Sequence, residues 1–139
     1  MSKVSQQVEI ASPGQVADAY LAHARCKSAA TQWAVDAVFD ITYAERWEEL
    51  WSVVLSIARR EEQIEVEALA FIAAGPLEDL ICKAGPAFID RVVHEAKFNK
   101  QFGRLLTGVW LRSADPMVRE HVTKFCRAFS DPIDGVYAF

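Results

Sequence analysis

The residues best able to do chemistry in this sequence are its histidines, cysteines and clustered carboxylates. The stretch His94–Phe98, HEAKF, begins like the zinc-binding helix of a metalloprotease but has no second histidine four residues after the first. His23 and His121 have no neighbours at the spacing of metal ligands. We therefore expect no metal and no cofactor.

Spacing also argues against nucleophilic or acid–base catalysis. The chain has three cysteines (Cys26, Cys82 and Cys126), far apart and without a CxxC pair, which predicts buried or inert thiols in a reducing compartment. No GxSxG motif is present. Adjacent carboxylates such as Glu48 and Glu49 diverge around a helix instead of converging on a substrate. We predict that the protein is not an enzyme.

The elements that must carry these residues have helical periodicity. Ser12 and Pro13 predict the cap and first position of a helix, and a second helix is expected over about 29–39. A third, beginning near Tyr43, places Trp47, Leu50, Trp51, Val54 and Ile57 on one face. A fourth is expected over about 61–73. No convincing alternation of period two is present, which predicts an all-α fold of seven or eight short helices, either an irregular bundle or stacked helix hairpins.

The tripeptide Ala-Gly-Pro occurs twice, at 74–76 and 84–86. Gly75 suits a helix C-terminus that needs positive φ, and Pro76 suits the first position of a new helix. Glu78 and Asp79 then fall in a first turn, where negative charge complements the helix dipole. Neither copy has the spacing of a phosphate-binding loop. We interpret both copies as stop-and-restart signals between helices.

The remaining helices are expected after Pro86, around Phe102–Trp110, and after the cap Asp115-Pro116. In the first of these, Arg91–Glu95 and Asp90–His94 are predicted to pair at i,i+4 on the solvent side. The helical spacing of the tryptophans favours packing in the core over a ligand cage. They are Trp33, Trp47, Trp51 and Trp110.

The length of 139 residues predicts a single domain spanning 1–139, with a flexible N-terminal arm over 1–11 and a C-terminal tail over 131–139. The first residues lack the apolar core of a signal peptide, and no apolar run is long enough to cross a membrane. We expect a cytoplasmic protein that does not enter a membrane.

Charge is unevenly distributed behind a net charge of −4. Residues 43–82 carry nine acidic residues against three arginines, a net charge of −6. Such a surface attracts a basic partner. We predict a protein-binding module, in its sharpest form an immunity- or inhibitor-like protein that covers a basic site on another protein. The predicted acidic face consists of Glu45, Glu48, Glu49, Glu61, Glu62 and Glu65. A homodimer that joins acidic and basic regions is an alternative.

The basic C-terminal part supports a second hypothesis. Residues 83–139 have a net charge of +3. A regulator that binds nucleic acid through this part is therefore the alternative function, although the acidic chain as a whole disfavours it. A small enzyme of unknown class is a third. The basic residues concerned are Lys97, Lys100, Arg104, Arg112, Arg119, Lys124 and Arg127.

Three segments together resemble a known family. They are ERWEELW at 45–51, the block Ala74–Leu80 (AGPLEDL), and the pair Val109-Trp110. The region from 44 to 112 is similar to an uncharacterised bacterial family of small all-helical domains marked by the Ala-Gly-Pro-Leu-Glu-Asp-Leu motif. The resemblance implies a helical cytosolic domain and transfers no catalytic residues. It makes Gly75, Pro76, Leu77, Glu78 and Asp79 the first candidates for a family-wide site.

Overall fold

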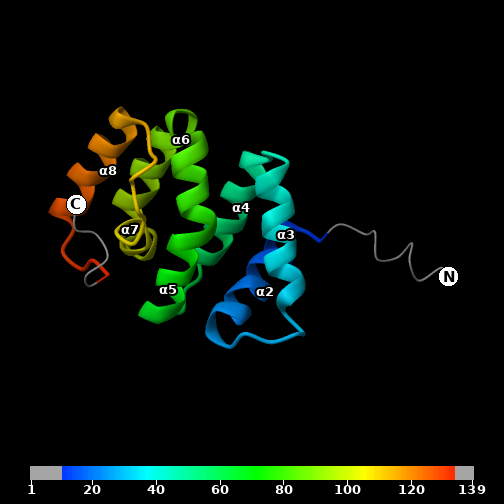
Figure 1. Cartoon of the computed structure of the whole chain (residues 1–139). Coiled ribbons are helices and arrows are strands. Elements are labelled where there is room, and N and C mark those ends of the chain that lie inside the picture. Colours follow the sequence, from blue (N-terminus) through cyan, green and yellow to red (C-terminus); the bar gives the residue numbers. More distant parts are fainter. Residues whose placement is uncertain (1–10, 134–139) are drawn as a thin grey trace.

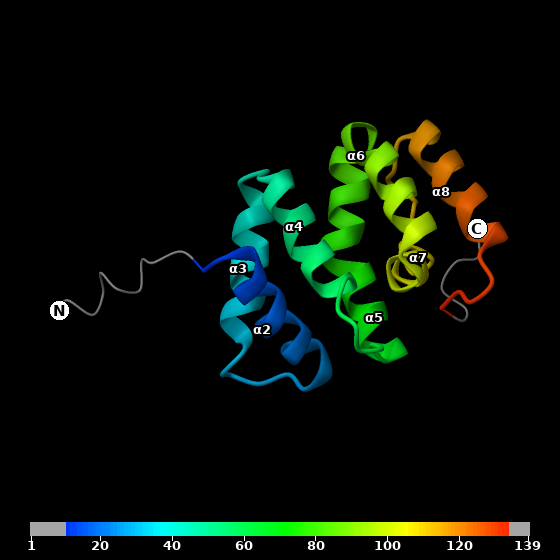
Figure 2. The same ribbon diagram turned by 180° about the vertical axis from the view of Figure 1, so that it is seen from behind.

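A computed structural model describes residues 11–133, and these form an all-helical, irregular bundle (Figure 1). Helices α2 and α3 lie at one end, α7 and α8 at the other, and α4, α5 and α6 between them (Figures 1 and 2). No strand occurs within the described residues. The predicted arm over 1–11 lies, apart from Ala11, outside the described residues, as does the predicted tail beyond Ile133.

The N-terminal half contains α2 (Pro13–Arg25), α3 (Gln32–Tyr43) and α4 (Trp47–Ala58). Ser12 and Gln15 cap α2 reciprocally: the Ser12 hydroxyl accepts from the Gln15 backbone N–H at 3.2 Å, and the Gln15 side chain accepts from the Ser12 N–H at 2.8 Å. This predicted cap is confirmed. The second helix begins three residues later than predicted and extends to Tyr43.

The central segment consists of α5 (Val66–Ile72), a π-helical turn η1 (Ala73–Leu77) and α6 (Glu78–Phe98), which follow one another without a loop. With α2, α3, α4, α7 (Lys100–Leu106) and α8 (Pro116–Ala128), the described residues therefore make six continuous helical segments. The prediction of seven or eight helices is wrong, because the chain changes direction near each Ala-Gly-Pro without a loop to separate the helical stretches. The backbone leaves helical geometry at Gly75 (φ −105°, ψ −105°) and at Ala84 (φ −131°, ψ 17°).

These two bends turn the chain back on itself. A straight α-helix over Val66–Phe98 would be about 50 Å long. Yet the Ile64 backbone N–H, just before the segment, donates to the Gln101 Oε1 atom, just after it, at 2.8 Å. The segment therefore consists of two limbs that meet at Ala84. Both views show this turn beside the label α6, at the top of the picture (Figures 1 and 2).

The two glycines of the repeated tripeptide are explained by close packing. Gly75 has negative φ, so the predicted left-handed helix end is wrong. A Cβ atom at Gly75 would lie 2.7 Å from the Tyr20 hydroxyl oxygen, and one at Gly85 would lie 3.0 Å from both methyl carbons of Val118. A Cβ atom at either position would therefore displace a side chain of another helix, which explains glycine there by close packing.

The C-terminal half is fixed by side-chain caps. The Asn99 side chain accepts from the Phe102 N–H at 3.1 Å at the start of α7, and the Asp115 side chain accepts from the Met117 N–H at 2.9 Å at the start of α8. After α8, the Ile133 N–H donates to the buried Thr107 hydroxyl at 2.9 Å. The first residues of the predicted tail are therefore packed against the domain.

The core runs between the halves of the bundle. Trp51 of α4 contacts Phe88 of α6 and Phe102 of α7, with ring centroids 5.9 Å and 5.6 Å apart. Core packing is confirmed for Trp51, but it is wrong for Trp33 and Trp110, which are 43% and 52% exposed. Within residues 11–133, no helix combines the length and the apolarity needed to cross a bilayer.

Candidate functional site

The predicted acidic face is largely neutralised by arginines of the same chain. Glu48 accepts two hydrogen bonds from Arg91 of α6, at 3.0 and 2.7 Å, and this contact holds the pKa of Glu48 below its usual value. The Glu49 carboxylate lies 2.8 Å from the Arg46 Nε atom. Four of the six glutamates of the predicted acidic face are paired with arginines: these two, and Glu62 and Glu65, which are described next.

Arg25 at the end of α2 joins the other two paired glutamates of the acidic face. Its guanidinium lies 2.7 Å from Glu62 and 3.0 Å from Glu65. The pKa of Glu65 is lowered chiefly by a hydrogen bond from the Glu65 backbone N–H to its carboxylate, and then by the hydrogen bonds from Arg25. Glu45 and Glu61 form no ion pair with the described residues. The binding role of the acidic face stays a prediction, but only two of its carboxylates are left without an arginine.

Three of the large hydrophobic side chains that are exposed among the described residues lie on α3. Phe39 is 65% exposed, Tyr43 is 94% exposed, and Trp33 lies on the same side. The opposite side of α3 is buried through Ala34, Val38 and Ile41, because an α-helix turns 100° per residue and these positions recur at intervals of three and four. We call the exposed side, formed by Gln32, Trp33, Asp36, Phe39, Asp40 and Tyr43, the α3 face.

The charge of the α3 face is entirely negative. Helix α3 contains no basic residue, and neither Asp36 nor Asp40 forms an ion pair among residues 11–133. Asp36 accepts only a hydrogen bond from Gln32, at 3.3 Å. Glu45, an unpaired residue of the predicted acidic face, lies two residues after the end of α3. Its backbone has a left-handed conformation (φ 57°). The α3 face thus combines exposed aromatic rings with uncompensated carboxylates.

Sequence reasoning missed the α3 face, although a signal was present. Phe39 and Tyr43 occupy the arc of the helical wheel that also contains Asp36 and Asp40, whereas a fully buried helix has no charged arc. Aromatic residues at polar positions of an amphipathic helix are the signal that could have been read from the sequence.

The family motif has a packing role. Pro76 and Leu77 are buried beside the bend. Burial, and then the charge of Asp79, raise the pKa of Tyr20 to about 12, and the Tyr20 hydroxyl lies where a Cβ atom at Gly75 would be. Asp79 also lies 3.5 Å from Lys83 one turn later.

Glu78 of the motif holds the loop that carries Trp110. The Trp110 backbone N–H donates to the Glu78 Oε1 atom at 3.3 Å, and the Trp110 carbonyl accepts from the Cys82 thiol at 3.5 Å. The Arg112 guanidinium lies 5.7 Å from the centre of the Trp110 ring. Two segments of the motif resemblance, Ala74–Leu80 and Val109-Trp110, are therefore in direct contact.

The basic residues of the C-terminal part do not lie on one element. Lys100 and Arg104 belong to α7, Arg112 to the following loop, and Lys124 and Arg127 to α8. Arg119 makes intramolecular hydrogen bonds: its guanidinium donates to the carbonyls of Leu111, Arg112 and Ala114, each at 3.2 Å. Nucleic-acid binding stays a prediction.

The histidines are also occupied by local contacts. The His23 Nδ1 atom lies 2.9 Å from the Thr31 hydroxyl, the His121 Nδ1 atom lies 2.8 Å from the Met117 carbonyl, and the His94 ring packs on Phe98. Across residues 11–133, no group of three histidine, cysteine or acidic side chains is arranged to hold a metal ion.

The fold and these surfaces define an all-helical domain with an edge helix, α3, on which exposed aromatic rings lie beside unpaired carboxylates. The chain belongs to a family of unknown function, DUF6869, whose model matches residues 22–129. The match extends beyond the region 44–112 that carries the motif resemblance, and it includes the α3 face. No curated protein and no solved structure matches the chain.

Proposed function

We propose that this protein is a binding module that recognises a basic amphipathic helix of another protein through the α3 face. The observation that carries the proposal is the exposure of Phe39 and Tyr43 next to Asp36 and Asp40. Aromatic side chains are enriched among the residues that contribute most to binding at protein interfaces. Their exposure on an edge helix is explained if a partner covers them.

The chemistry of the partner follows from the charge of the surface. Because Asp36 and Asp40 are one helical turn apart on the α3 face, Lys or Arg residues spaced at i,i+3 or i,i+4 on a partner helix can reach both. Apolar residues on the same side of that helix would pack against Phe39 and Tyr43. Charge complementarity of this kind raises the association rate and excludes acidic partners.

An immunity- or inhibitor-like role is the narrower form of this proposal. It requires the basic segment to belong to the active site of a toxin or enzyme. The acidic face predicted from sequence supports it less well than the α3 face, because Arg25, Arg46 and Arg91 already occupy four of its six carboxylates.

The experiment first identifies a partner by photo-crosslinking in the native host, with the crosslinker replacing Tyr43 and, as a control, Glu120 on α8. The partner is then purified and its affinity measured. We expect Phe39→Ala with Tyr43→Ala to weaken binding about a hundredfold, a typical loss for two central aromatic residues. Asp36→Lys with Asp40→Lys should weaken it further at low salt.

Glu61→Lys is the matched control, because Glu61 is an exposed carboxylate without an ion pair that lies outside the α3 face. Its affinity for the partner should equal that of the wild type. Binding that survives the Phe39 and Tyr43 changes but is abolished by Glu48→Lys and Glu65→Lys would overturn the proposal and transfer the role to the acidic face.

A further inference from the structure

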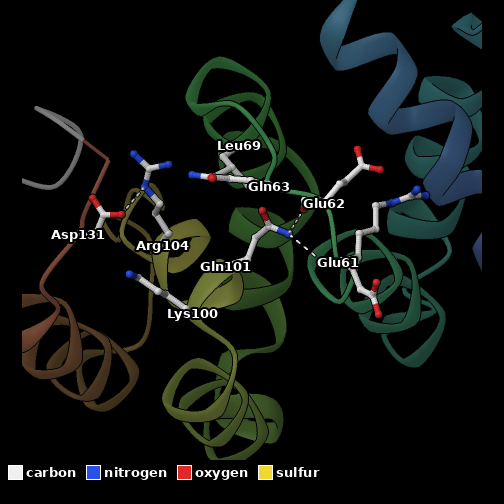
Figure 3. A pocket seen from close by; sticks show the side chains of 9 residues that line it. Glu61, Glu62, Gln63, Leu69, Lys100, Gln101, Arg104 and Asp131 are labelled. Atoms are coloured by element: carbon white, nitrogen blue, oxygen red, sulfur yellow. Dashed lines mark hydrogen bonds and ion pairs between the residues drawn. The ribbon is translucent and has the colours of Figure 1, made fainter.

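A cavity of about 280 Å³ opens between the α4–α5 loop, α7 and the segment after α8 (Figure 3). Its volume is close to the ~300 Å³ at the small end of ligand sites. The cavity is separate from the α3 face, and neither the family match nor the proposed function gives it a role. Eight of its nine lining residues are polar or charged, and Leu69 is the apolar exception.

Gln101 fixes one wall of the cavity. Its Oε1 atom accepts from the Ile64 N–H at 2.8 Å, and its Nε2 atom donates to the carbonyls of Ala58, Arg60 and Glu62 at 3.4–3.5 Å. One amide thus faces four backbone groups at the end of α4 and in the α4–α5 loop, and the contact with the Ile64 N–H is the short one. The wall is preformed, and the Gln101 side chain is itself unavailable to a ligand.

Two cations of α7 face the cavity without adequate partners. Lys100 and Arg104 are spaced at i,i+4, so they lie on the same side of the helix and repel each other. Within residues 11–133, Lys100 forms no ion pair, and the buried Arg104 Nε atom has no hydrogen-bond partner. The nearest carboxylate to Arg104 is that of Asp131, at 3.5 Å, which is beyond good hydrogen-bond geometry.

The other acidic side chains of the cavity do not balance this charge. The Glu62 carboxylate is bound to Arg25 at 2.7 Å. Figure 3 shows the carboxylates of Glu61 and Glu62 on the side of the cavity opposite Lys100 and Arg104, with Gln63 between the two sides. Arg60, which also lines the cavity, is paired with Asp18. The part of the cavity next to Lys100 and Arg104 therefore has two positive charges and, from Asp131, one negative charge.

We infer that this cavity binds the phosphate group of a small molecule between Lys100 and Arg104. A phosphate monoester carries a charge between about −1.5 and −2 at neutral pH, which two cations balance. The guanidinium supplies paired N–H donors and the ammonium supplies a point charge. The Gln63 side chain is exposed at the edge of the cavity and can donate an amide N–H to a third oxygen. Asp131 acts as a competing carboxylate that the phosphate displaces from Arg104.

Inorganic phosphate is the probe, titrated into the full chain at low salt and followed by amide NMR shifts. We expect saturable shifts at Gln63, Lys100 and Arg104. Arg104→Gln should weaken binding by about tenfold or more, as expected for the loss of a charge-assisted bidentate contact. Lys100→Gln, at an exposed position, should weaken it without affecting the fold. Asp131→Asn should strengthen it, because the competing charge is removed.

Lys124→Gln with Arg127→Gln is the matched control, because it removes two positive charges from α8 and leaves the cavity intact. Its phosphate affinity should equal that of the wild type. Weakening by this control as large as that by Arg104→Gln would show nonspecific attraction and overturn the inference. Absence of saturable shifts, or equal affinity for acetate, would overturn it as well. None of these outcomes depends on a protein partner at the α3 face.

Discussion

Glu95 in the second limb of α6 accepts two hydrogen bonds from Arg59 at the end of α4, at 2.9 and 2.7 Å. The Asn99 amide adds a third, at 3.0 Å, and also donates to the Ala58 carbonyl at 3.3 Å. The Glu95 side chain is only 12% exposed. This carboxylate joins the N-terminal half of the bundle to the C-terminal half.

Glu95→Gln is predicted to destabilise the protein by about 1 kcal/mol at pH 7, a value reduced for the exposure of Arg59. The hydrogen bond from Arg59 is the main reason that the pKa of Glu95 is lowered. A lowered pKa contributes stability above the pKa of the unfolded state and loses it as pH falls through the folded value. The difference between wild type and variant in urea unfolding should therefore shrink at pH 3. Glu61→Gln is the control and should change stability little at either pH.

Gly85→Ala is predicted to destabilise the domain by about 1–3 kcal/mol, because the new methyl group would collide with Val118 and separate α6 from α8. Thermal unfolding measures the effect. Gly14→Ala in α2 is the matched control: its Cβ would have no neighbour closer than 3.9 Å, so the variant should be neutral or slightly more stable. Adding Val118→Ala to Gly85→Ala should recover part of the loss. Equal effects at Gly14 and Gly85 would contradict the packing explanation.

Thr107→Val is predicted to cost about 1–3 kcal/mol, because it leaves a buried N–H without its acceptor. The Thr107 hydroxyl is fully buried, donates to the Arg104 carbonyl at 2.6 Å and accepts from the Ile133 N–H. Valine has nearly the same shape, so the loss measures the hydrogen bonds. Thr107→Ser retains the hydroxyl and should be the milder change in urea unfolding. The opposite order would mean that the methyl group matters more than the hydrogen bonds.

Phe39→Ser with Tyr43→Ser is predicted to leave the free energy of unfolding within about 0.5 kcal/mol of the wild type, as for other exposed positions. Val38→Ala, in the same helix but 5% exposed, should cost about 1–2 kcal/mol. Chemical unfolding of the isolated protein tests both. A large loss for the serine variant would mean that the two rings stabilise the domain itself, and the α3 face would lose its claim to be a binding surface.

The three thiols are predicted to react with an alkylating reagent in a fixed order at pH 8. Cys26 is exposed and reacts first. Burial, and then the charge of Glu78, raise the pKa of Cys82, and burial raises that of Cys126 to about 12. A raised pKa reduces the thiolate fraction, so Cys82 should react slowly and Cys126 only on unfolding. Mass spectrometry of peptides after timed alkylation gives the order. Early labelling of Cys126 would contradict its burial.

The sequence was sufficient to predict what depends on near neighbours in the chain. The all-α class, the caps at Ser12 and Asp115, and the buried stripe of α4 follow from local chemistry and helical spacing, and the structure confirms them. Helix boundaries were less accurate: the segment predicted to begin at 61 becomes helical only at Val66, because Arg25, Arg60 and Gln101 hold the preceding loop.

What depends on distant contacts was not predictable. Arg91 and Glu95 have the spacing of a pair on one helix. In the structure, however, Arg91 is paired with Glu48 of α4, and Glu95 is paired with Arg59 at the end of α4. The net charge of residues 43–82 does not include Arg25 and Arg91, which lie outside that range in the sequence but pair with its glutamates in the structure. Cys26 was expected to be buried or inert, but it ends α2 at the surface.

The reversal of the central helix at Ala84 constrains how related sequences can differ in length. Because Ile64 and Gln101 are held together at the base, an insertion in one limb alone would shift that limb past the other and break the contact. Tolerated insertions and deletions should therefore fall at the tip, or occur in both limbs at once in multiples of a helical turn. A relative lengthened in one limb only would have to replace the Gln101 contact with a different closure.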